Sequence, residues 1–246
     1  MCLLAIFHRV VDRAPLLVAA NREEFFDRPF LPPHVQGDRT RFLAGVDVRA
    51  GGTWLGVNER GMMAAVTNRP KIALPDQPRS RGLLCRELLE QPSVAIAREF
   101  IRRELTTGAY AGANFVVADA RDGILVEAGD ELSISWLVPG LHLITNGPAN
   151  SPLDPRQLLA REMFAATPPY DVPSFLTAAR RVCSQGPDAI GRSIVLRRAA
   201  RGTVSSTLLA LTIEPQEAVC EFAAGSPDVT PYEDYSHELR KLLITA

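Results

Sequence analysis

The feature that most constrains the fold is the way strand-like and helix-like segments are grouped along the 246 residues. Apolar runs at 3–10 and 16–20 are separated by a short polar turn, which predicts a β-hairpin. A second hairpin is predicted at 53–67, because the loop at 58–61 ends in glycine. Strands follow strands here, so the pattern does not match the strict strand–helix alternation of a parallel sheet.

The rest of the chain continues this grouping, with two pairs of helices placed between blocks of strands. We expect helices at 80–90, 93–105, 155–165 and 172–183, further strands at 114–118, 124–128, 133–138, 141–145, 206–213 and 218–222, and a short amphipathic helix at 232–244. The predicted fold is therefore α+β, a four-layer α-β-β-α sandwich of two antiparallel sheets, forming a single domain over residues 1–246.

Composition restricts the classes of partner. The 27 basic and 28 acidic residues give a formal net charge of −1 without long runs of one sign, so nothing indicates nucleic acid or an anionic membrane surface. No apolar run reaches the ~20 residues that cross a bilayer, and the N-terminal segment lacks the basic start of a signal peptide. The four cysteines are scattered without a CxxC pair, which favours free thiols in a reducing cytoplasm.

Cys2 is the residue that most suggests chemistry, because it follows Met1 and runs straight into an apolar strand. Removal of Met1 would leave a thiol and a free α-amine on one residue. A nucleophile and its base are paired in this way in N-terminal-nucleophile hydrolases. The alternative is a cysteine that packs as a small apolar side chain near a strand edge.

Polar residues stand at the ends of several predicted strands. Arg22 and Glu23 follow the strand at 16–20, and we expect Arg22 to lower the pKa of a nearby thiol and Glu23 to orient an α-ammonium group. Asn68 and Asn146 each follow a threonine at the end of an apolar strand, with a proline two residues later. An asparagine amide donates hydrogen bonds without charge, as an oxyanion site requires, although a single such asparagine is usually a turn former.

Three further residues complete the candidate site. Trp54 lies in the glycine-rich segment 51–58 and is expected either to line a pocket or to fill the core. Together with Arg22, we assign Asn21, Trp54 and Arg69 to substrate binding. No metal site or cofactor is expected, because the four histidines lie far apart and no HExxH, GxSxG or phosphate-loop motif occurs.

These segments together resemble the NRDE proteins, also called the transport-and-Golgi-organisation-2 (TANGO2) family. The motifs that carry the resemblance are Met1-Cys2, residues 17–25 followed by Arg28-Pro29, residues 51–56 and residues 65–68, with shorter matches at 79–82, Asn114, Thr145-Asn146 and 202–207. They keep their order and cover nearly the whole chain.

A second resemblance concerns mechanism. Residues 56–70 resemble a loop and strand of the choloylglycine and penicillin V acylases, which are N-terminal-cysteine amidases of the α-β-β-α fold. This resemblance implies that Cys2 is the nucleophile and Glu23 the carboxylate near it. It also implies that Asn68 and Asn146 hold the oxyanion and the α-amine.

The chain departs from these families at three positions. Glu23 replaces the aspartate of the Asn-Arg-Asp-Glu motif that names the NRDE family, Ala20 stands where the acylases have arginine, and Val204 stands where relatives commonly have arginine. The leading hypothesis is a hydrolase that cleaves an amide or acyl (thio)ester bond of a small molecule through Cys2. The family resemblance implies an alternative, a non-catalytic carrier of a hydrophobic ligand such as haem or an acyl lipid. A third is an inactive descendant in which Cys2 only packs.

Overall fold

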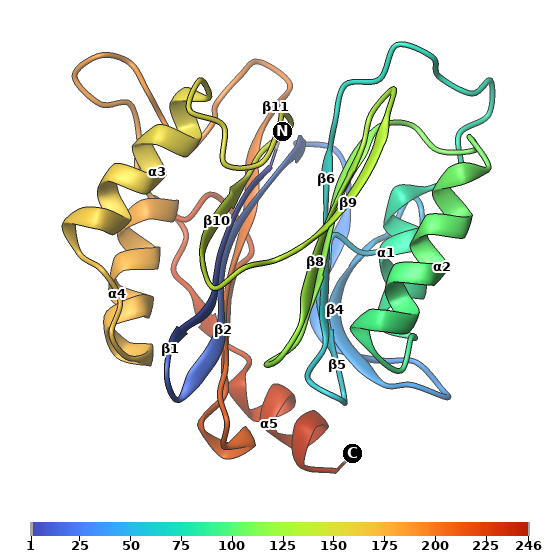
Figure 1. The fold of residues 1–246 in the computed structure, drawn as a ribbon. Coiled ribbons are helices and arrows are strands. Elements are labelled where there is room, and N and C mark those ends of the chain that lie inside the picture. Colours follow the sequence, from blue (N-terminus) through green and yellow to red (C-terminus); the bar gives the residue numbers. More distant parts are fainter. Residues whose placement is uncertain (1, 246) are drawn as a thin grey trace.

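Two antiparallel β-sheets lie face to face in the structure, a computed structural model that describes residues 2–245 (Figure 1). The first sheet has six strands, in the spatial order β10 (Gly140–Ile144), β1 (Leu3–Val11), β2 (Ala14–Phe25), β11 (Arg201–Leu211), β12 (Val219–Ala223) and β13 (Glu233–Asp234). The second has seven, in the order β3 (Phe30–Gln36), β4 (Phe42–Asp47), β5 (Leu55–Asn58), β6 (Met63–Asn68), β7 (Ala113–Ala118), β8 (Gly123–Ala128) and β9 (Leu132–Trp136).

Pairs of helices cover the outer faces of both sheets (Figure 1). The helices α3 (Pro155–Ala166) and α4 (Val172–Cys183) pack on the first sheet, whereas α1 (Arg81–Leu89) and α2 (Val94–Thr106) pack on the second. The order of layers is therefore α-β-β-α, which confirms the predicted fold. A short 3₁₀ helix (Pro215–Glu217) precedes β12, and α5 (Ser236–Ile244) lies near the C-terminus. Among the described residues, no helix is both long and apolar enough to cross a membrane.

Alternating side chains on β1 serve two different cores. Leu4 and Ile6 are buried in the core between the sheets, whereas Leu3 and Ala5 are buried against α3 and α4. Both sets are apolar because β1 is covered on both faces, and successive residues of a strand point to opposite faces. Cys2 precedes this strand, so the alternation sends its side chain toward the space between the sheets, as for Leu4.

Two strands of the second sheet were absent from the sequence-based prediction. β3 contains two prolines, which remove donors from a sheet, and it is accommodated because it forms an edge of the second sheet. β4 contains Gly45, whose missing side chain leaves room for the ring of Trp54, since a Cβ there would lie 2.6 Å from the indole. The prediction was also wrong at 232–235, because Glu233 and Asp234 pair with β12 and α5 begins only at Ser236.

Candidate active site

The N-terminal end of β1 brings three of the predicted residues into one row across the first sheet. β1 pairs with β2 on one side and with β10 on the other. Continuing the β2 register by one residue sets Cys2 opposite Arg22, and continuing the β10 register by two residues, just past the end of β10, sets it opposite Asn146. Neighbours in such a row share a face of the sheet. The hairpin and the β10 pairing thus set Cys2 beside a cation and an amide, on the side that faces the second sheet.

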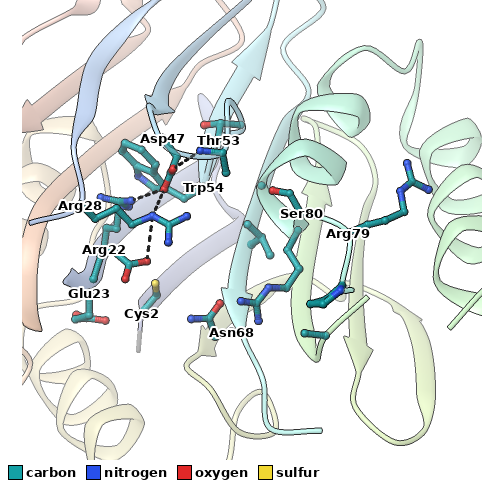
Figure 2. A pocket seen from close by; sticks show the side chains of 17 residues that line it. Cys2, Arg22, Glu23, Arg28, Asp47, Thr53, Trp54, Asn68, Arg79 and Ser80 are labelled. Carbon is teal, nitrogen blue, oxygen red and sulfur yellow. Dashed lines mark hydrogen bonds and ion pairs between the residues drawn. The ribbon is translucent and has the colours of Figure 1, made fainter. Parts of the chain in front are cut away.

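Cys2 lines a cavity of about 420 Å³ between the ends of the two sheets. Arg22 and Glu23 line it from the first sheet, and Trp54 and Asn68 from the second. In the view of Figure 2, Cys2 lies between Glu23 and Asn68 with Arg22 above it. The other lining residues are Glu24, Arg28, Asp47, Ala50, Thr53, Val66, Pro78, Arg79, Ser80, Arg81, Gly82 and Ala111.

Glu23 is a buried carboxylate of this cavity. Its Oε1 accepts a hydrogen bond from Arg156 Nη2 of α3 at 2.9 Å, and Thr203 Oγ1 of β11 lies 3.4 Å from the same oxygen. Burial raises the pKa of Glu23 to about 7, although the charge of Arg156 acts in the opposite direction. Glu23 therefore changes its protonation state near neutral pH, which is where a group that assists acid–base chemistry is most useful.

Burial is also the main influence on the Cys2 thiol. Burial first, and the charge of Glu23 second, raise the pKa of Cys2 above its ordinary value. A backbone hydrogen bond from Glu23 and the Arg22 guanidinium act in the opposite direction and are outweighed. The expected effect of Arg22 thus has the right sign, but the thiol is neutral at neutral pH and needs a base before it can attack.

Asp47 holds the cationic side of the cavity together. Its Oδ2 accepts hydrogen bonds from Arg22 Nη2 at 3.0 Å and from Arg28 Nε at 2.5 Å, and its Oδ1 accepts one from the Ala50 backbone N–H (Figure 2). Burial raises the pKa of Asp47, but the hydrogen bonds from Arg28 and Ala50 and the arginine charges outweigh it and lower the pKa overall. Asp47 is therefore a carboxylate that fixes two arginines beside the thiol.

Trp54 supports Arg22 from the second sheet. The Arg22 guanidinium carbon lies 4.3 Å from the centroid of the Trp54 ring, a distance typical of a cation–π contact. Trp54 also packs against the core between the sheets. The Trp54 side chain therefore does both things expected from the sequence: it lines the cavity and it packs against the core.

The loop between β4 and β5 is pressed against the start of α1. Thr53 N–H donates to the Gly82 carbonyl at 2.9 Å, and a Cβ on Gly52 would lie 2.2 Å from the Gly82 carbonyl carbon. Glycine is required at position 52 by this close approach of two backbones. The contact fixes the first turn of α1 at the edge of the cavity.

Asn68 ends β6 at the cavity, and its side chain is exposed there. Within residues 2–245 its amide makes no hydrogen bond, so both N–H groups are available to a ligand. Among the lining residues, it is a neutral donor on the sheet opposite to Cys2. A neutral amide there can donate a hydrogen bond to an oxygen atom of a bound ligand.

Asn146 lies in a loop that is tied to the second sheet. Thr67 Oγ1 and Asn114 Nδ2 donate to the Thr145 carbonyl at 2.7 and 3.1 Å, and Asn114 Nδ2 also lies 3.2 Å from the Gly147 carbonyl. Asn146 Oδ1 is buried and has no hydrogen-bond partner among the described residues. It is an acceptor next to Cys2 in the row, not a lining residue of the cavity.

Two predicted substrate-binding residues lie elsewhere. Asn21 points to the opposite face of β2, where its Nδ2 donates to the Cys183 carbonyl at 2.9 Å. Arg69 Nη1 donates to Glu127 Oε1 at 2.9 Å and to Asn114 Oδ1 at 3.0 Å. Neither lines the cavity. Successive residues of a strand point to opposite faces, so Asn21 faces α4 when Arg22 faces the cavity. Arg69 is held by its hydrogen bonds to Glu127 and Asn114.

Sequence reasoning missed several residues of the site. Asp47 ends the unpredicted β4, and Arg156 lies in the first turn of α3, far from Glu23 in the chain. Ser80 and Arg81 lie at the start of α1, and the family-like segment 79–82 was the available signal. The expected removal of Met1 concerns a residue outside the described range.

The architecture defines the class of fold, an α-β-β-α sandwich of two antiparallel sheets that is shared with solved acylases and amidases. Penicillin V acylase from Agrobacterium tumefaciens matches with a TM-score of 0.60 and 14% identity over 97% of this chain and 88% of that chain. The Caenorhabditis elegans orthologue of N-acylethanolamine-hydrolysing acid amidase matches with a TM-score of 0.55 and 14% identity over 85% of this chain and 92% of that chain. A mutant conjugated bile acid hydrolase from Clostridium perfringens matches with a TM-score of 0.56 and 12% identity over 96% of both chains. At these identities the matches concern the fold alone.

The family model of Transport and Golgi organisation 2 (TANGO2) matches residues 1–168, and the chain belongs to this family. The human Transport and Golgi organization protein 2 homolog is 32% identical over 146 residues, which are 56% of this chain and 52% of the relative. The mouse homolog is 34% identical over 108 residues, which are 42% and 38%. The chain thus matches about half the length of these curated relatives or less.

Proposed function

We propose that this protein is an N-terminal-cysteine hydrolase that cleaves an amide or acyl (thio)ester bond of a small molecule. The observation that carries the proposal is that Cys2, Glu23 and Asn68 line one cavity, with Asn146 in the loop that follows β10, the strand paired with β1. A nucleophile, a carboxylate and a neutral donor are the groups that acyl transfer through a thiol requires. The fold supports the proposal, since its solved relatives bear the names of acyl- or amide-cleaving enzymes.

The first half of the proposed reaction forms a thioester. Loss of the residue before Cys2 frees its α-amine, whose ordinary pKa of about 7.7–8.0 suits it to accept the thiol proton. The thiolate attacks the carbonyl carbon, and the resulting oxyanion accepts a hydrogen bond from Asn68 Nδ2. The ammonium then returns its proton to the leaving nitrogen, oxygen or sulfur atom as that bond breaks, and the acyl group remains on Cys2.

The second half releases the acid. The amine takes a proton from a water molecule, the hydroxide attacks the thioester carbonyl, and Asn68 again serves the oxyanion. The carbon–sulfur bond breaks, the free acid leaves, and the ammonium proton restores the Cys2 thiol. No oxidant, metal or cofactor enters this balance.

Glu23 and Asn146 orient the amine in this proposal. Asn146 Oδ1 is a buried acceptor without a partner among the described residues, and a free α-amine on Cys2 supplies donors next to it. Glu23 provides a second acceptor and, when ionised, favours the ammonium form. These groups keep the amine lone pair directed at the thiol of the same residue.

The proposal is tested by the processing state of the N-terminus and by acyl transfer to Cys2. Intact-mass measurement on protein produced without an N-terminal tag is expected to show loss of Met1. A thiol-reactive acylating probe is expected to modify wild type but not Cys2→Ala, since Cys85, Cys183 and Cys220 are buried. A Cys220→Ala control is expected to label normally, and Cys2→Ala is expected to lose turnover of an acyl and amide substrate panel. Retention of Met1, or turnover that survives Cys2→Ala, would exclude the proposed mechanism.

A further inference from the structure

Four arginines line the cavity, and they differ in how their charges are balanced. Arg22 and Arg28 share Asp47, and Arg28 also lies 3.8 Å from Glu24. Arg79 pairs outside the cavity with Glu104 at 2.6 Å and with Glu87 at 3.9 Å. Arg81 forms no ion pair with any carboxylate of residues 2–245. One cationic charge of the cavity is therefore left without a counterion.

The setting of Arg81 leaves one edge of its guanidinium open. Its Nη1 donates to the Gly112 carbonyl at 2.7 Å, and neither Nε nor Nη2 makes a hydrogen bond within the described part of the chain. The Nε–Nη2 edge presents two parallel N–H groups, the geometry that carboxylate and phosphate oxygens accept. Gly112 thus anchors the side chain by one nitrogen and leaves the recognition edge free.

Arg81 belongs to the same electrostatic environment as the nucleophile. It is the first residue of α1, in the turn that Ser80 caps and that the Gly52–Gly82 contact holds in place. Burial lowers the pKa of Arg81, and the charges that oppose this effect are those of Cys2 and Glu24. A partly buried cation is costly unless an anion accompanies it, and Glu24 is already engaged by Arg28.

We propose that Arg81 binds an anionic group of the substrate, so that the molecule cleaved at Cys2 carries a carboxylate or a phosphate near its scissile bond. This inference rests on the proposed function, because it assigns a substrate class to the same cavity. The anion would lie on the α1 side of the cavity, opposite the first sheet that carries Cys2. Its binding would complete the charge balance that the protein leaves open.

The test uses three pairs of compounds that differ by one anionic group. N-acylglycine and N-acylglycinamide carry or lack a carboxylate on the leaving side, N-acylphosphoethanolamine and N-acylethanolamine carry or lack a phosphate there, and succinyl and butyryl p-nitroanilides differ on the acyl side. Wild type is expected to hydrolyse the anionic member of at least one pair with a higher kcat/KM than the neutral member. The pair that shows this preference identifies the anion, carboxylate or phosphate, and the side of the scissile bond on which it lies.

Arg81→Gln is expected to raise KM for that anionic substrate by about tenfold to a hundredfold, the range of a lost charged hydrogen bond. The neutral partner should change by no more than about twofold. Arg81→Lys is expected to restore part of the preference, because it keeps the charge but loses the two-pronged edge. The matched control is Arg86→Gln on the same helix, where Arg86 lies outside the cavity and 3.9 Å from Glu90.

Failure of the two proposals can be told apart by binding to Cys2→Ala, measured by calorimetry with the same pairs. If no pair is hydrolysed but Cys2→Ala binds an anionic member more tightly than Cys2→Ala/Arg81→Gln does, the hydrolase fails and the anion site stands. If Cys2-dependent hydrolysis occurs without preference in any pair, the anion site is excluded and the hydrolase stands. Equal losses for both members of a pair in Arg81→Gln would likewise exclude it, because they indicate a structural role.

Discussion

Glu23 of β2 and Arg156 of α3 form an ion pair between the first sheet and the helix that packs on it, with 2.9 Å between Glu23 Oε1 and Arg156 Nη2. Both side chains are nearly buried, at 3% and 11% exposure. Burial nevertheless raises the pKa of Glu23 to about 7, so the pair is complete only when the pH exceeds that value. Because of this burial, the charge of Glu23 changes with pH near neutrality.

A first prediction concerns stability against pH. The pKa of Glu23 is raised from an ordinary value of 4.5 to about 7 by folding, so the folded state binds more protons than the unfolded state between these values. Stability from this group is therefore present at low pH and falls as pH rises from about 4.5 through 7. The full effect is on the order of 3 kcal/mol, since one pKa unit corresponds to about 1.4 kcal/mol.

Glu23→Gln cannot ionise and is expected to remove this decline. The measurement is urea unfolding of wild type and variant at pH 5, 6, 7 and 8, which compares slopes and not absolute stabilities. The comparison of slopes is needed because the variant also loses the ion pair with Arg156. Parallel pH dependences for the two proteins would contradict the raised pKa of Glu23.

A second prediction concerns Asp47, whose loss leaves two arginines without their shared partner. Asp47→Ala is expected to destabilise the protein by about 3–5 kcal/mol, because the Arg22 side chain is only 5% exposed. Asp47→Asn keeps the shape and some hydrogen bonds, so it should cost less. Folding lowers the pKa of Asp47 from its ordinary value of 3.8, so its contribution is present above that value and is lost as the pH falls below it.

Thermal unfolding of both Asp47 variants at pH 7 measures these losses. An exposed pair serves as the control, since Arg102 and Glu99 lie on the surface of α2 and Glu99→Ala should cost less than about 1 kcal/mol. A loss for Asp47→Ala no larger than that of Glu99→Ala would show that Asp47 does not hold the two arginines.

The fold could be predicted from the sequence where local pattern and long-range pairing agree. The apolar run of β1 and the polar turn after it predict the hairpin, and its register then sets Cys2 beside Arg22. Asn146 enters the same row because β10 pairs with the other side of β1, which no local pattern encodes. The likeness of the strand ends at Asn68 and Asn146 was the signal available for it.

The remainder of the site depends on contacts between distant segments. Asp47 was missed because the strand that contains it was not predicted. β3 carries prolines and β4 carries a glycine, and both residue types are unfavourable in strands. Asn21 was assigned to the site because it neighbours Arg22, yet adjacent strand residues point to opposite faces. Arg81 belongs to the family-like segment 79–82 but was not assigned to the site, because a helix start predicts a cap and not the cavity that Arg81 lines.

A third prediction concerns the contact between the two backbones at the edge of the cavity. Gly52→Ala would place a Cβ 2.2 Å from the carbonyl carbon and 2.6 Å from the carbonyl oxygen of Gly82, which are not flexible side-chain atoms. The loop or α1 must shift, and we expect a loss of about 2 kcal/mol or more. The matched control is Gly186→Ala, which meets nothing within 4 Å and should be nearly neutral.

Both glycine variants are compared by thermal unfolding and by the rate at which the acylating probe modifies Cys2. The displaced α1 should slow acylation in Gly52→Ala while Gly186→Ala labels like wild type. Equal stability and equal labelling of the two variants would show that the backbones separate without cost.

The last prediction concerns Asn68. Its amide makes no hydrogen bond within residues 2–245 and its side chain is exposed, so Asn68→Ala should change the unfolding temperature little. Removal of an oxyanion donor is expected to lower kcat by about 10²–10³ with a much smaller effect on KM, because the bond strengthens as charge develops on the carbonyl oxygen. Asn68→Asp should be at least as severe, since a carboxylate repels the oxyanion. A kcat within about twofold of wild type for a well-folded Asn68→Ala would remove Asn68 from the oxyanion site, and Asn146→Ala would then be the variant that decides which amide serves it.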